Sequence, residues 1–120
     1  MFEKSAKSSY LLSDERQHPF ALQTSINRAY SMILEKIKET PYENLIEGKD
    51  YWEIFVARNP NLEVTYYLID EKNGSTRVVM LVYTPNSRGK ARKILREMIV
   101  EYKQYFEKFL AKSIYNAPAY

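Results

Sequence analysis

Residues 1–120 are predicted to form a single α+β domain in which two main helices pack on one face of a three- or four-stranded antiparallel sheet. Two observations indicate this class. Apolar residues recur with a helical period near both ends of the chain, over residues 20–39 and 90–112. Between them lie three short segments rich in Val, Ile, Tyr and Phe, separated by turn-forming residues. The predicted order of elements is therefore (β)-α-α-β-β-β-α.

The first predicted helix runs from Phe20 to Glu39 and starts after His18-Pro19, because proline is tolerated in the first turn of a helix. Its apolar side chains fall on one stripe, which is typical of a helix resting on a core. The stripe consists of Leu22, Ile26, Ala29, Tyr30, Ile33, Leu34 and Ile37.

A second, short helix is predicted for "TPYENLIEG", residues 40–48. Thr40 can cap this helix, Glu43 completes a capping box, and Gly48 can end it. All these signals are local, so the prediction depends on the segment forming its own hydrogen bonds.

Three strands follow, "YWEIFVA" (51–57), "EVTYYLI" (63–69) and "TRVVMLVYT" (76–84). The first two are separated by an Asn-Pro-Asn turn, and Asn73-Gly74 is a strong hairpin signal between the second and third. Tight turns between consecutive strands predict an antiparallel meander.

The last helix is predicted from Lys90 to Lys112, after Pro85 ends the third strand. Its apolar stripe consists of Ile94, Leu95, Met98, Ile99, Tyr102, Tyr105, Phe106, Phe109 and Leu110. "SSYLL" (8–12) is an optional fourth strand.

The three central strands are apolar on both faces, whereas a sheet covered on one side should alternate apolar and polar residues. Two helices can cover only one face. The other face must be covered by the N-terminal segment, the C-terminal "SIYNAPAY", a second copy of the chain, another protein or a small apolar ligand. We therefore predict a non-catalytic interaction module that forms a homo-oligomer or binds a protein partner. The predicted contact residues are Tyr51, Phe55, Tyr67, Ile69 and Tyr83.

A basic segment opens the last helix and provides an alternative function, the binding of RNA or DNA phosphates. It contains five bases and no acid, although the net charge of the whole chain is only +3. A helix N-terminus carries a partial positive charge and free N–H groups, so cations there are locally unfavourable whereas phosphate is favoured. The bases are Arg88, Lys90, Arg92, Lys93 and Arg96.

The order helix, three antiparallel strands, helix is similar to that of double-stranded-RNA-binding domains, and "SRGKARK" resembles the lysine-rich opening of their final helix. With a strand before the first helix, the order also resembles that of ribosome hibernation factors. Both are similarities of arrangement, from which no family membership follows.

Several classes of site are disfavoured by composition. The chain has no Cys and a single histidine, His18, so neither a thiolate nor a histidine cluster can bind a metal. It contains no glycine-rich phosphate loop, nucleophile elbow or H-E-x-x-H motif, and we predict no catalytic residue, cofactor or metal. It has no apolar run long enough for a membrane span and no secretory h-region. We expect a cytoplasmic location, although an exported chain without its leader would look the same.

Overall fold

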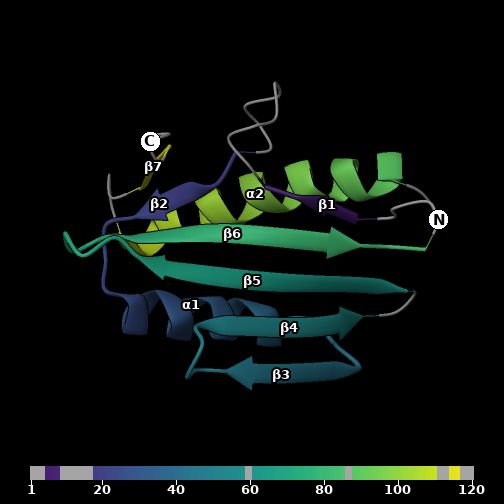
Figure 1. Ribbon diagram of the computed structural model, residues 1–120, viewed down its shortest axis with the longest axis horizontal. Helices are drawn as coiled ribbons and strands as arrows, with labels where there is room; N and C mark the ends of the chain where they lie inside the picture. The colour runs from purple at the N-terminus through teal and green to yellow at the C-terminus, as the bar shows by residue number, and fades with distance from the viewer. Residues whose placement is uncertain (1–4, 9–17, 59–60, 86–87, 111–113, 117–120) are drawn as a thin grey trace.

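A computed structural model describes residues 5–8, 18–58, 61–85, 88–110 and 114–116 (Figure 1). The predicted α+β class is confirmed, because the described residues form one antiparallel sheet and two helices. The elements are β1 (Ser5–Lys7), β2 (Phe20–Leu22), α1 (Ile26–Lys38), β3 (Asn44–Gly48), β4 (Glu53–Arg58), β5 (Leu62–Asp70), β6 (Thr76–Tyr83), α2 (Arg88–Leu110) and β7 (Ile114–Asn116).

Within the described residues the sheet has seven strands in the order β3-β4-β5-β6-β2-β7, with β1 also paired to β6, so the prediction of three or four strands was too low. Strands β3 to β6 form a meander of consecutive antiparallel pairs. The far edge of β6 is shared by two short strands, β1 opposite residues 81–83 and β2 opposite residues 76–78. Strand β7 pairs with β2. The described part of "SIYNAPAY" therefore extends the sheet at its edge.

Both helices lie behind the sheet in the view of Figure 1 and cover one face. That face supplies alternate residues of the meander to a single buried cluster, which also contains Ile33 and Ile37 of α1 and Leu95 and Phe106 of α2. The contributing strand residues are Ile54, Val56, Val64, Tyr66, Leu68, Val78, Met80 and Val82. The inward residues of β5 and β6 are those that strand alternation predicts.

Helix α1 begins at Ile26, six residues later than predicted. The Ser25 side chain is its N-cap and accepts a hydrogen bond from the Arg28 amide at 3.2 Å. His18 and Pro19 precede a strand, and 20–22 pair with both β6 and β7. The predicted helix extends too far towards the N-terminus because Leu22 continues the spacing of the apolar stripe. In the structure Leu22 is instead buried as part of strand β2.

The prediction of a short helix at residues 40–48 is wrong, because this segment contains strand β3, which pairs with β4. The Glu43 amide donates to the Ala57 carbonyl at 2.8 Å. The Arg58 guanidinium donates to the carbonyls of Ile37, Thr40 and Pro41 at 2.9, 3.0 and 2.7 Å. Ala57 and Arg58 of β4 are distant in sequence from residues 40–48. Their hydrogen bonds to this segment and to the end of α1 stabilise the strand more than a helix of this length could be stabilised by its own hydrogen bonds.

The remaining boundaries lie close to their predicted positions. Strand β4 starts two residues later than predicted, β5 is longer by one residue at each end, and α2 spans 88–110 where 90–112 was predicted. The optional strand at 8–12 falls mainly outside the described residues, although Ser8, just after β1, is described. In the part of the chain that the structure describes, no helix is long and apolar enough to cross a membrane.

Candidate functional site

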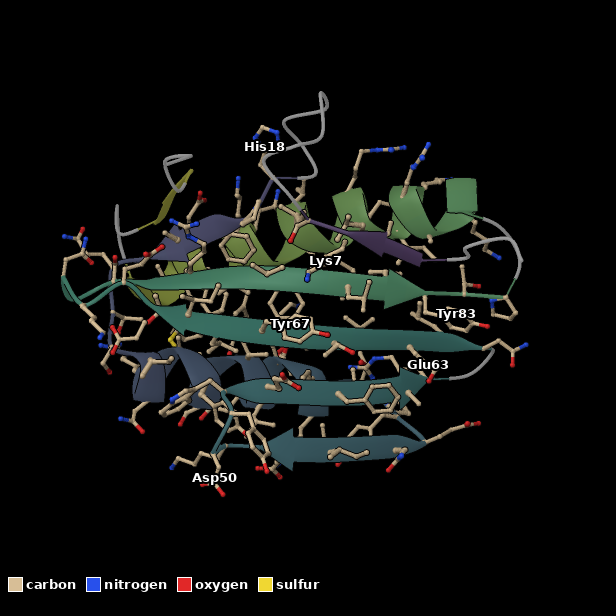
Figure 2. The ribbon with its side chains drawn as sticks, viewed as in Figure 1. Lys7, His18, Asp50, Glu63, Tyr67 and Tyr83 are labelled. Carbon is tan, nitrogen blue, oxygen red and sulfur yellow. The ribbon has the colours of Figure 1, made fainter. Side chains whose placement is uncertain are left out.

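The sheet face opposite the helices, which we call the open face, presents large apolar side chains. Its register aligns Phe55, Thr65 and Leu81 in one row across β4, β5 and β6, and places Tyr67 beside Val79 and Glu63 beside Tyr83. Ile46 of β3 and Lys7 of β1 extend the Phe55 row on either side. Figure 2 shows the side chains of Lys7, Glu63, Tyr67 and Tyr83 on this face. The exposed large hydrophobic residues of the face are Ile46, Tyr51, Ile69 and Tyr83.

Two hollows lie side by side on the open face. The larger, of about 440 Å³, is the Lys7 hollow, and its lining includes Lys7, Tyr51, Tyr67, Ile69 and Val79. The smaller, of about 300 Å³, is the Glu63 hollow, lined by Phe55, Glu63, Thr65, Leu81 and Tyr83. Both are open depressions with aromatic walls, a shape suited to receiving protruding side chains.

The turn between β3 and β4 directs Tyr51 to the open face. The Tyr51 amide donates to the Gly48 carbonyl at 3.1 Å, and Trp52 has a left-handed backbone with φ of 57°. This conformation costs an ordinary residue about 1 to 2 kcal/mol. The Trp52 ring packs edge-on against Tyr30 of α1 at 5.8 Å between centroids, while Tyr51 is 77% exposed. Trp52 thus fixes the turn to the core and leaves Tyr51 free to make contacts.

Among the described strand residues, the open face carries two bases, Lys7 and Arg77, and two acids, Glu53 and Glu63, so it is not a uniformly positive surface. The Lys7 ammonium lies 5.1 Å from the centre of the Tyr67 ring. Arg77 forms an ion pair with Glu71. Glu53 and Glu63 share the face, because they pair with Tyr67 and Tyr83 respectively. Nucleic-acid backbones require a positive surface, so these charges do not favour phosphate binding at this face.

The structure brings all five predicted contact residues to the open face. Tyr51 and Ile69, which is 46% exposed, line the Lys7 hollow together with the partly buried Tyr67. Phe55, partly buried, and Tyr83, 40% exposed, line the Glu63 hollow. Whether these residues bind a partner stays a prediction.

The predicted phosphate-binding residues lie at the start of α2, where the first turn contains no acid. Lys90, Arg92 and Lys93 are exposed and Arg96 is half-buried, whereas the Arg88 side chain lies outside the described residues. The bases do not form a purely cationic surface. Lys93 and Arg96 share a hollow of about 520 Å³ with Glu97 and Glu101.

Lys103, a further base of α2, packs against the core and does not extend the basic segment. Its ammonium lies 6.0 Å from the centre of the Phe20 ring. Burial lowers the pKa of the Lys103 ammonium, although nearby Glu107 opposes this shift.

Another cleft, of about 330 Å³, lies on the helix side, and Tyr66, Tyr102 and Arg58 are among its lining residues. The hydroxyls of Tyr66 and Tyr102 are hydrogen-bonded at 2.8 Å. Burial raises the pKa of both phenols well above their ordinary value of 10.0. Both phenols therefore stay protonated near neutral pH, and their hydroxyls link β5 to α2 through a buried hydrogen bond. Among the described residues, no group of three or more His, Asp or Glu side chains could hold a metal ion.

Sequence reasoning missed several residues of the open face, among them Ile46 and Lys7. Ile46 was missed because its segment was interpreted as a helix; as a strand paired with β4, the same segment places Ile46 beside Phe55. Nothing in the sequence near Lys7 indicates that β1 pairs with the far edge of β6, because such long-range pairings leave no local pattern.

No protein-family model matches this chain, and no curated protein matches its sequence significantly.

Proposed function

We propose that this chain is a non-catalytic protein-interaction module that self-associates through the open face of its sheet. The proposal is supported by the apolar side chains that stay accessible on the sheet face that neither helix covers. Ile46, which is 55% exposed, Tyr51, Ile69 and Tyr83 stay accessible on one contiguous surface, with Phe55, Tyr67 and Leu81 partly accessible between them. A contiguous apolar surface on a soluble domain usually marks an interface.

The size of the open face is consistent with a dimer of moderate affinity. At about 3.4 Å per residue and about 4.8 Å between strands, the face from β3 to β1 covers roughly 20 by 24 Å. A standard interface buries about 800 Å² on each partner. The accessible area of this face approaches that value, because side chains project from it and enlarge its area beyond the flat outline. Burial contributes about 25 cal/mol per Å², but ordering and association costs offset most of it. We therefore expect a dissociation constant in the micromolar range.

Sedimentation velocity from about 1 to about 100 μM tests the proposal, because this range brackets micromolar association. The test variant is Ile69→Thr with Tyr83→Ser. The matched control is Val100→Thr with Phe109→Ser, which removes exposed apolar groups of similar size from α2, 48% and 57% exposed. We expect the open-face variant to weaken association about tenfold or more while the control does not. A native chain that is monomeric throughout, or equal weakening by both variants, contradicts the proposal.

The alternative proposal is the binding of nucleic-acid phosphates by the start of α2. The observation that favours it is the absence of any acid from the first turn of α2, together with three exposed bases, Lys90, Arg92 and Lys93. A helix selected only for stability would place Asp or Glu there.

Fluorescence anisotropy with labelled duplex RNA and DNA at low salt tests the alternative. The triple variant Arg92→Ala, Lys93→Ala, Arg96→Ala should weaken binding and reduce the salt slope by up to about 0.9 for each phosphate that it no longer neutralises. The control Lys38→Ala, Lys49→Ala, Lys108→Ala removes the same charge from other exposed positions. Absence of binding to either duplex, or equal weakening by the control, refutes this alternative.

A further inference from the structure

The Lys7 hollow presents a cation that has no acidic partner among the described residues. The Lys7 side chain is exposed, and its ammonium contacts the face of the Tyr67 ring. The other base of this hollow, Arg77, is already paired with Glu71. Lys7 is therefore the charge that this hollow can offer to an incoming group.

The Glu63 hollow presents the complementary charge. Glu63 is half-buried beside Phe55, Leu81 and Tyr83, and no described base forms an ion pair with it. A carboxylate partly removed from water among aromatic rings gains more from an opposite charge than an exposed one does. Within the described part of the chain, the two hollows of one face thus carry opposite charges that lack ion-pair partners.

Within one chain these two charges are too far apart to meet. Lys7 pairs with Leu81, and Glu63 pairs with Tyr83 on the other side of β6. The two residues are separated by two strand spacings and two residues along the strand, or about 12 Å between Cα atoms. Figure 2 shows the two side chains apart on the same face.

We propose that two copies of this chain pack open face to open face about a two-fold axis, so that Lys7 of each copy meets Glu63 of the other. This inference rests on the proposed self-association and specifies its geometry. A two-fold interface is self-complementary, so one Lys7–Glu63 contact generates a second. The axis lies in the plane of the interface and passes over β6 between Leu81 and Tyr83.

The same rotation also matches the apolar parts of the two hollows. Applied to an idealised sheet with the register of β4, β5 and β6, it brings Phe55 of one copy over Val79 of the other. Phe55 lines the Glu63 hollow and Val79 lines the Lys7 hollow, so the Glu63 hollow of one copy faces the Lys7 hollow of the other. Tyr67 lies close to the axis and contacts Tyr67 of the second copy.

A charge-swap experiment tests this geometry. Lys7→Glu or Glu63→Lys alone places like charges together at both contacts, and we expect each to weaken dimerisation about tenfold or more. The double variant Lys7→Glu, Glu63→Lys exchanges the two charges and should recover most of the native affinity. The control swap Lys93→Glu, Glu97→Lys on α2, with its single variants, should change affinity by less than about threefold at each step.

Sedimentation velocity on the native chain and the variants distinguishes the possible failures. A native dimer whose single variants weaken association without recovery in the double variant overturns the proposed geometry but leaves self-association standing. A native dimer whose affinity is unchanged by every charge reversal also overturns the proposed geometry and leaves self-association standing. A native chain that is monomeric at about 100 μM overturns both proposals and assigns the open face to another part of the chain or to a foreign protein.

Discussion

Replacing Tyr66 by Phe removes one hydroxyl from the core and leaves the hydroxyl of Tyr102 without its partner. The two oxygens are 2.8 Å apart, and the side chains are 1% and 3% exposed. The ring contact, with centroids 5.4 Å apart, is unchanged by the substitution. The perturbation is therefore confined to one buried hydrogen bond.

An orphaned buried hydroxyl costs about 1 to 3 kcal/mol of unfolding free energy, whereas removing both partners of a hydrogen bond can be nearly neutral. Tyr66 and Tyr102 both line the helix-side cleft of about 330 Å³, which is large enough to admit water to an orphaned hydroxyl. We therefore expect the lower part of the range, about 1 to 2 kcal/mol, for each single variant. The double variant Tyr66→Phe, Tyr102→Phe should lose less than the sum of the two.

Urea unfolding followed by circular dichroism measures these losses. With a slope of about 2 kcal/mol per M, each single variant should lower the unfolding midpoint by about 0.5 to 1 M. The coupling free energy from the double-mutant cycle should be about 1 kcal/mol or more. Additive losses, with the double variant equal to the sum, would refute the argument that the orphaned group carries the cost.

Further predictions concern pH, a helix cap, a turn and an ion contact. Because burial holds the phenol pKa values of Tyr66 and Tyr102 above 10.0, their contribution to stability is present below pH 10 and is lost as the pH rises further. The unfolding free energy should fall by up to about 1.4 kcal/mol per pH unit for each phenol, and less in the double Phe variant. Ser25→Ala should cost about 1 kcal/mol in urea unfolding, because it removes the α1 cap, while Ser25→Asp should retain most of the stability. Gly74→Ala should lower the melting temperature by a few degrees, because Gly74 has φ of 86°; no loss would show that the turn can rearrange. Arg58→Met should cost about 1 to 3 kcal/mol of unfolding free energy, since the carbonyls of Ile37, Thr40 and Pro41 lose their donor, and Arg58→Lys should recover only part of it.

Local patterns in the sequence were sufficient to predict strands β4 to β6 of the meander and the two helices, apart from the start of α1. The alternation of Val64, Tyr66 and Leu68 against Tyr67 and Ile69 separates the buried from the open side of β5, because side chains of a strand alternate between faces. Asn73-Gly74 predicts the following turn for a comparable local reason, since glycine tolerates its positive φ.

Pairings between distant segments were decided only by the tertiary structure. Residues 20–22 form a strand because β6 and β7 lie on either side of them, and Asn44–Gly48 is a strand because β4 pairs with it. Lys7 reaches the open face through the pairing of β1 with β6, whose partners lie more than 70 residues along the chain. A short segment cannot satisfy its own backbone groups, so hydrogen bonds from distant strands determine its conformation. The sequence by itself thus determined that the central strands would be apolar on both sides, whereas the long-range pairing of the short strands decided which charges accompany that apolar surface.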